Sequence, residues 1–285
     1  MDSISPAQVK ELRERTGIGI MECKRALEAA SGNLDLAIEN LRKSSSLKAE
    51  KKALRTTADG IIRVAGSDKS VYMLELNSET DFVAKEQSFV DFAEKVLQTA
   101  IAKNTCKLEE VMSEDLEKAR QELIQKIGEN INVRRLTRLE GEAVYSYTHN
   151  DKIGVLVCLD QKLDAIGKDV ALHIAAAAPL YISPEQVEEA YLAKEKEIYF
   201  AQAQDSGKPP AVIEKMVEGR LRKHLADICL LDQQFVKNPD WKVRKVLKPD
   251  NVEVKVTSFI RYQVGEGIEK ETIDFAEEVK TQAGL

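Results

Sequence analysis

The chain has 285 residues, of which 43% are hydrophobic and 32% charged, and its formal net charge is −6. That length exceeds what one small core organises, and the composition suits soluble globular modules rather than a disordered chain. A general nucleic-acid binder needs a basic surface that displaces counterions, so the acidic balance argues against stable nucleic-acid binding.

The first residues of the chain and its longest apolar runs indicate in which cellular compartment the protein is expected. Six of the first fifteen residues are charged, which is not the pattern of an apolar signal segment. The longest apolar runs, 153–159 and 174–182, are far shorter than the roughly 20 residues that cross a bilayer. We therefore expect a cytoplasmic protein that makes no membrane contact.

The four cysteines lie more than fifty residues apart, so no close pair exists for zinc or redox chemistry. We expect them to be small buried side chains in a reducing compartment. They are Cys23, Cys106, Cys158 and Cys229.

Residues 5–43 predict three short helices, which form a small N-terminal module over 1–54. Gly17 and Gly32 end the first two helices, and Asn33 is a good N-cap for the third. The stretch 42–55 carries six basic residues and one acid. This pattern predicts a linker or a solvated helix.

The middle of the chain holds two copies of one unit, a β-hairpin followed by a helix. In chain order the predicted strands and helix are 61–65, 71–76 and 89–102, and then 142–147, 153–159 and 168–178. We expect each sheet to gain a third strand, from 130–138 in the first copy and from 252–264 in the second. Two small antiparallel sheets covered by helices form an α+β core.

A helical stretch at 184–231, broken near residue 206, predicts an antiparallel helical hairpin inserted into the second copy. Its predicted seam places two sets of side chains face to face: Val187, Tyr191, Ile198 and Ala201 against Ile213, Val217, Leu221 and Ile228. Residues 272–281 predict a short C-terminal helix. The expected modules are 1–54, 55–139, 140–180 with 229–263, the hairpin 181–228, and 264–285.

Searches for catalytic motifs find no phosphate-binding loop, no nucleophile elbow and no metal-ligand spacing among the three histidines. Gly265 and Gly267 follow a strand as in a dinucleotide loop, but Lys270 stands where the third glycine belongs. We therefore expect no catalytic residue, no metal and no cofactor. His149 is a contact candidate because it lies at a hairpin tip.

Comparison of the two copies exposes an extra loop in the first. From Leu159 to Asp169 the second copy spans ten positions, whereas Leu76 and the equivalent Asp91 lie fifteen apart. The fold unit closes without the additional residues, which fall within 77–84. A loop phenylalanine exposes apolar area to water. Either Phe82 and Val83 therefore fold back onto the core, or Phe82 provides an anchor for a partner's pocket.

The loop and five other segments resemble the elongation factor Ts family. The central motif is Thr80-Asp81-Phe82-Val83, after a strand and before a helix. The others, in order, are LRERTG (12–17), MECK (21–24), KIGENI (126–131), MVEGR (216–220) and GEGIEK (265–270). The resemblance spans about residues 3 to 280. Two departures are Ile20, where methionine is common, and the stiff hairpin turn at 208–210.

The resemblance implies a non-catalytic guanine-nucleotide exchange factor, with a UBA-like first module and a coiled-coil hairpin, that binds the GTPase elongation factor Tu. It implies that Asp81 and Phe82 disturb the magnesium site of that partner, while Thr80 and Val83 shape the loop.

The same resemblance implies that Arg13, Ile20 and Met21 grip the partner's nucleotide-binding domain. His149 would make a second contact, and the hairpin is a candidate surface for docking or for a homodimer.

Two other classes of function remain as alternatives. A nucleic-acid-binding protein would use the N-terminal module with the basic stretch 42–55, and its binding would depend strongly on salt. A small-molecule enzyme would need paired titratable groups in a pocket, and the sequence offers no such pair.

Overall fold

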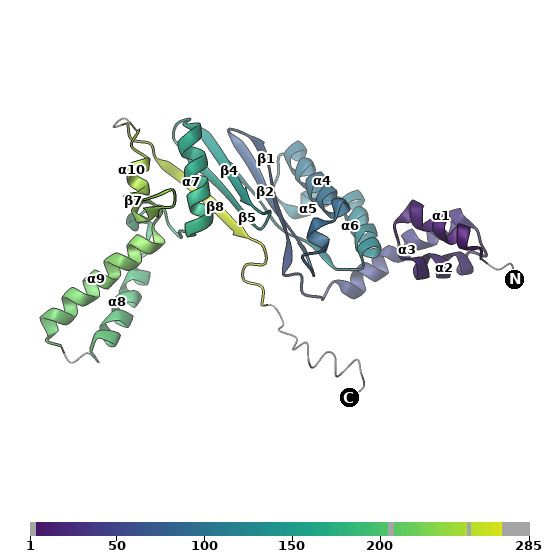
Figure 1. Ribbon diagram of the computed structural model, residues 1–285, viewed down its shortest axis with the longest axis horizontal. Helices are drawn as coiled ribbons and strands as arrows, with labels where there is room; N and C mark the ends of the chain where they lie inside the picture. Colours follow the sequence, from purple (N-terminus) through teal and green to yellow (C-terminus); the bar gives the residue numbers. More distant parts are fainter. Residues whose placement is uncertain (1–3, 205–207, 250–251, 270–285) are drawn as a thin grey trace. The chain divides into compact units, whose positions relative to one another are not determined.

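The computed structural model (Figure 1) describes residues 4–204, 208–249 and 252–269. The chain divides into two compact units. The first unit comprises Met1–Ala65, Tyr72–Thr137 and Gln263–Leu285, and the second comprises Gly66–Val71 and Arg138–Tyr262. Each unit combines helices with a three-stranded sheet, which confirms the predicted α+β class. The finer division into modules remains a proposal.

Three helices at the start of the chain pack around one small core. They are α1 (Pro6–Thr16), α2 (Ile20–Ala29) and α3 (Leu34–Lys52). Ser5 caps α1 by accepting a hydrogen bond from the Gln8 N–H at 3.3 Å. Gly17 ends α1 with a φ of 69°, a left-handed conformation that glycine adopts without strain. The core side chains are Leu12, Ile18, Cys23, Ala26, Leu27, Ala30, Ala37 and Leu41.

The helix α3 continues through most of the stretch that the charge pattern predicted as a linker or solvated helix. Ser45 and Ala49 are buried on α3, which packs along α6 (Glu114–Ile127). Small side chains four residues apart share one helix face and let two helices approach closely. The basic side chains Lys43 and Lys51 stay exposed. The third helix therefore joins the N-terminal module to the first sheet's core instead of separating them.

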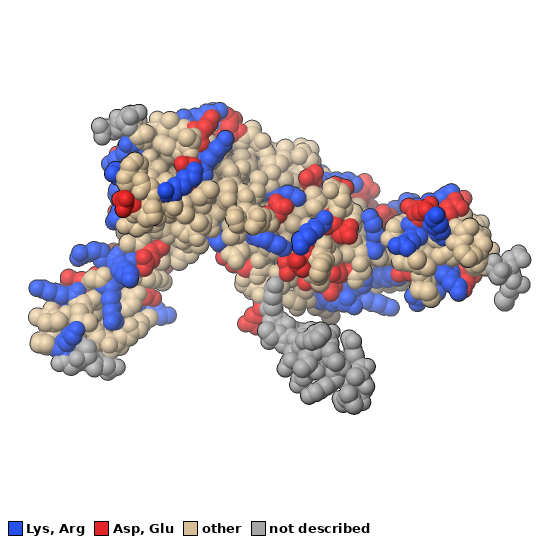
Figure 2. Space-filling view, in the orientation of Figure 1, with Lys and Arg blue, Asp and Glu red and all other residues tan. Residues whose placement is uncertain are grey.

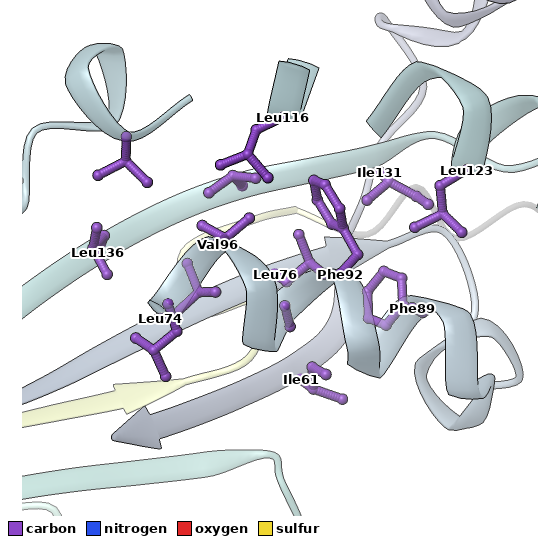
Figure 3. Close-up of a cluster of buried hydrophobic side chains, with 14 of the residues drawn as sticks. Ile61, Leu74, Leu76, Phe89, Phe92, Val96, Leu116, Leu123, Ile131 and Leu136 are labelled. Carbon is purple, nitrogen blue, oxygen red and sulfur yellow. The ribbon is translucent and has the colours of Figure 1, made fainter. Parts of the chain in front are cut away.

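The first sheet has the strand order β1-β2-β3 (Asp59–Ser67, Ser70–Ser78 and Ile131–Glu140). The helices α4 (Gln87–Lys103), α5 (Leu108–Val111) and α6 cover it. Figure 3 shows the side chains of these helices meeting those of the strands, among them Phe89, Phe92 and Leu74. The third strand lies where the sequence predicts it.

The second sheet has the order β4-β5-β8 (Ala143–His149, Ile153–Leu159 and Val256–Gln263), and its third strand is also confirmed. The hairpin β4-β5 is antiparallel, with Ala143 opposite Leu159 and His149 opposite Ile153. Its core includes side chains of α7 (Asp164–Ala177), as the repeat predicts.

The inserted hairpin consists of α8 (Glu189–Gln204) and α9 (Pro210–Ile228). Ile213 and Val217 are buried as predicted, but Ala203 lies opposite them in the buried cluster and Ile198 is 40% exposed. Tyr191 faces α9 as predicted, since its hydroxyl lies 2.8 Å from His224 Nε2. Farther along α8 the prediction is wrong: Ala201 is exposed as well, because Tyr199 and Ala203, four positions apart, share the face that packs on α9. The predicted helix at 272–281 lies outside the described residues.

Several short elements of the second unit have no counterpart in the sequence prediction. They are η2 (Pro184–Gln186), η3 (Leu230–Asp232), β6 (Gln234–Phe235), β7 (Asn238–Lys242) and α10 (Val243–Val246). The buried His173 of α7 organises this region, since its Nε2 lies 3.0 Å from Gln233 Oε1 and its Nδ1 accepts the Val236 N–H. Burial lowers the pKa of His173.

Cys23, Cys158 and Cys229 are buried, as predicted, and Cys106 is half-buried. Burial raises the pKa of the Cys229 thiol to about 11. In the described part of the chain, no helix is both long enough and apolar enough to span a bilayer.

Glu75 is a buried charge in the first unit. Its carboxylate accepts hydrogen bonds from Arg134 Nη1 at 3.0 Å, from the Gly265 N–H at 2.9 Å and from Arg135 Nε. Burial alone would raise the pKa of this carboxyl, but the hydrogen bonds from Gly265, Arg135 and Arg134 outweigh burial and lower it. The turn at Gly265 is thereby tied to β2.

Replacing Glu75 with alanine should lower the free energy of unfolding by about 3 kcal/mol, because two arginines lose their shared carboxylate. Chemical denaturation measures this change. Glu14→Ala is the matched control, because Glu14 pairs with Lys10 on the surface at 3.8 Å, and it should leave stability nearly unchanged. If the two substitutions lowered the free energy of unfolding equally, Glu75 would not be the stabilising buried carboxylate described here.

The same carboxylate predicts a pH dependence. Since folding lowers the pKa of Glu75, its contribution is present above a pH of roughly 4.3 and is lost as the pH falls through the folded pKa. Glu75→Gln should therefore lose less stability on acidification than the parent protein.

Candidate functional site

The extra loop of the first copy connects β2, which ends at Ser78, to α4, which begins at Gln87. It contains one short 3-10 turn, η1 (Val83–Lys85). The Ser78 hydroxyl starts the turn of the chain by donating a hydrogen bond to the Thr80 carbonyl at 2.9 Å. The insertion is thus an ordered structure with its own internal hydrogen bonds.

Phe82 and Val83 have opposite surroundings. Val83 and Ala84 are buried in the core of the first sheet, whereas Phe82 is 76% exposed. The sequence left open whether both residues fold onto the core or whether Phe82 faces a partner. The structure divides the pair, because Val83 fastens the loop and Phe82 projects into solvent.

Asp81 and Lys85 flank the exposed ring. The Lys85 ammonium lies 3.3 Å from an Asp81 carboxylate oxygen and 5.9 Å from the centroid of the Phe82 ring. Both charged side chains are largely exposed, so these contacts are weak and exchange readily with water. A partner could therefore compete for Asp81 and Phe82 at small cost.

Glu129, which the sequence analysis does not single out, holds the N-terminal side of the loop. Its carboxylate accepts hydrogen bonds from the Thr80 N–H at 2.9 Å and from the Thr80 hydroxyl at 2.6 Å. In return, the Asn130 N–H donates to Glu79 Oε1 at 2.6 Å. In the sequence, Glu129 and Asn130 stand out only as members of the KIGENI motif. A motif does not show which segment its residues contact.

The N-terminal module brings Arg13 and Ile20 together on the walls of one surface groove of about 430 Å³. The groove is lined by Ile4, Pro6, Val9, Lys10, Arg13, Ile20 and Lys24. Ile20 is half-exposed, and its neighbour Met21 is 64% exposed. Figure 2 shows both signs of charge on these helices, where Lys10 pairs with Glu14 and Lys24 pairs with Glu28.

His149 lies at the end of β4 in the second unit, as the hairpin prediction requires. Asn150 and Asp151 form the turn with φ values of 49° and 56°. This left-handed pair is typical of a tight hairpin, and asparagine and aspartate tolerate it well. The Tyr147 hydroxyl lies 3.1 Å from His149 Nδ1, which orients an exposed imidazole.

Replacing Val83 with alanine should lower the free energy of unfolding by about 2 kcal/mol, since two buried methyl groups are lost. Phe82→Ala should change it by less than about 0.5 kcal/mol, because the ring is mostly in water. Paired denaturation curves test both values. A Phe82→Ala variant that loses as much stability as Val83→Ala would show that the ring is a core residue.

Comparison with known proteins supplies the family. A profile described as Elongation factor TS matches residues 79–266, which is more than half of the chain. A protein named Elongation factor Ts from Hahella chejuensis (strain KCTC 2396) is 50% identical over 285 residues, covering 99% of both chains. Another of that name from Francisella tularensis subsp. novicida (strain U112) is 50% identical over 288 residues, with equal coverage. The chain therefore belongs to the elongation factor Ts family.

Proposed function

We propose that this chain is a guanine-nucleotide exchange factor that binds elongation factor Tu carrying GDP and promotes GDP release, so that GTP can bind. Membership of the elongation factor Ts family supports elongation factor Tu as the partner. The observation that carries the proposal is the exposed Phe82, fastened beside the buried Val83 on an ordered loop. An exposed ring on a supported loop suits insertion into another protein's pocket.

Thermodynamic linkage explains how docking releases a nucleotide. A protein that binds the nucleotide-free GTPase more tightly than the nucleotide-bound form weakens nucleotide binding by the same factor. No covalent bond forms or breaks in this process. The role we propose is therefore non-catalytic, and it is exercised in the cytoplasm, where translation takes place.

The partner's magnesium site is the proposed target of Asp81 and Phe82. Magnesium requires a nearly ideal octahedron and is held by few protein ligands together with phosphates and waters. Displacing a nearby segment by about 1 Å would disturb that geometry. Burial of the Phe82 ring would contribute about 1.5–3 kcal/mol, equivalent to about one to two decades of affinity.

The other predicted contacts would supply docking. We propose that the groove formed by Arg13 and Ile20, together with the exposed Met21, binds the nucleotide-binding domain of elongation factor Tu. An apolar groove with cationic side chains suits an apolar partner surface that carries carboxylates. His149 would provide a separate polar contact from the second unit.

Phe82→Ala should lower the maximal rate constant of GDP release about tenfold or more, because the wedge is removed while the fold is retained. The measurement is stopped-flow release of fluorescent GDP from elongation factor Tu at increasing concentrations of the exchange factor. Trp241→Ala is the matched control, since Trp241 is another exposed aromatic, on β7, with no assigned role.

Two results would count against this function. The first is a Phe82→Ala variant that releases GDP as fast as the parent protein. The second is saturable binding or hydrolysis of guanine nucleotide by the chain alone, since an exchange factor acts only through its partner.

We also propose that the hairpin α8-α9 serves as a second docking arm and as a surface for homodimer formation. Ile198, Phe200 and Val212 leave apolar area exposed along it. Ile198→Ser combined with Phe200→Ser should weaken self-association measured by light scattering. A parent protein that has the mass of one chain at every concentration would contradict the homodimer.

A further inference from the structure

The loop that carries Phe82 is held at two places, and the second is polar. Val83 fastens its C-terminal side in the core, and Thr80 fastens its N-terminal side to Glu129. Both Glu129 carboxylate oxygens are used, one by the Thr80 N–H and one by the Thr80 hydroxyl. Two hydrogen bonds to one carboxylate restrict direction as well as distance.

The segment after α6 also holds the end of α3. The buried Asn130 amide donates to the carbonyls of Ala53 at 3.3 Å and Arg55 at 3.1 Å. The Arg55 guanidinium lies 3.5 Å from Glu79 Oε1, which also accepts the Asn130 N–H. The base of the loop, the end of α3 and the end of α6 therefore share one hydrogen-bonded clamp.

The same two helices support the N-terminal module, which contains the proposed docking groove. Glu22 of α2 accepts hydrogen bonds from Lys48 of α3 and from Gln125 of α6, the latter at 2.9 Å. Gly17 lies so close to Lys126 that a Cβ there would meet the lysine Cε at 2.7 Å. Within the first unit, the groove and the Phe82 loop are thus mounted on one pair of helices.

We propose that Glu129 is a positioning residue for exchange: by gripping Thr80, it fixes the direction in which Phe82 enters elongation factor Tu. This inference rests on the proposed function. Glu129 need not touch the partner, because its effect passes through Thr80. Without this grip, Thr80 would lose both hydrogen bonds to the segment after α6, and the direction of the wedge would have to be fixed during the encounter.

The test is GDP release from fluorescent-GDP-loaded elongation factor Tu by Glu129→Ala, compared with the parent chain. We expect the maximal rate constant to fall about tenfold while the half-saturating concentration changes less than about twofold, since the docking groove is untouched. Thr80→Val keeps the N–H and loses the hydroxyl, so it should also reduce the maximal rate. Thr80→Ser keeps both donors and should lose less.

Combining Glu129→Ala with Phe82→Ala gives the decisive readout. If Glu129 acts through the wedge, the double variant should be no slower than Phe82→Ala alone. Asp115→Ala controls for the loss of an exposed carboxylate from α6, and thermal melting verifies that each variant is folded. Thr80→Val carries the same test if Glu129→Ala fails to fold.

Three results would overturn the inference. One is a normal maximal rate for Glu129→Ala while Phe82→Ala is slow, which would leave the proposed function intact. Another is a raised half-saturating concentration with an unchanged maximal rate, which would make Glu129 a docking residue. The third is an additive loss in the double variant. Normal exchange by Phe82→Ala itself would instead remove both proposals.

Discussion

The proposed wedge depends on the burial of Val83 beside the exposed Phe82. Consecutive residues in a 3-10 turn point in directions about 120° apart, so burying Val83 and Ala84 in the core directs the preceding side chain outward. Burial of Val83 stabilises the folded loop, whereas the Phe82 ring stays largely in water. The core thus holds the ring in solvent, where it contributes little to this chain's own stability.

The helices α3 and α6 support both the N-terminal module and the base of the Phe82 loop. Because α3 contributes Ala37 and Leu41 to the N-terminal core and Ala49 to the first sheet's core, it belongs to both. Hydrogen bonds from Asn130 then secure its end beside the base of the loop. Because the docking groove and the wedge are carried on shared helices, their relative position is set before binding. This reduces the conformational entropy that is lost on association.

Much of the architecture follows from local pattern. The two hairpin-plus-helix copies, their third strands and the three N-terminal helices were predictable because strand alternation, helix caps and glycine turns act over a few residues. The extra loop was visible because one copy lacks it. The charge pattern at 42–55 left a linker and a solvated helix open; the helix forms as far as Lys52, and the charges gave no sign that Ser45 and Ala49 would be buried. Helix periodicity placed Ile198 in the seam of the hairpin, but Tyr199 and Ala203 occupy it instead. Glu129 could not be assigned from sequence, since its partner Thr80 lies 49 positions away.

The structure of the complex with nucleotide-free elongation factor Tu tests the central claim most directly. We expect Phe82 to be buried against the partner near its magnesium site, with Val83 still in its own core and Glu129 still bonded to Thr80. A complex in which Phe82 remains in solvent, or in which the loop leaves its core to bind, would contradict it.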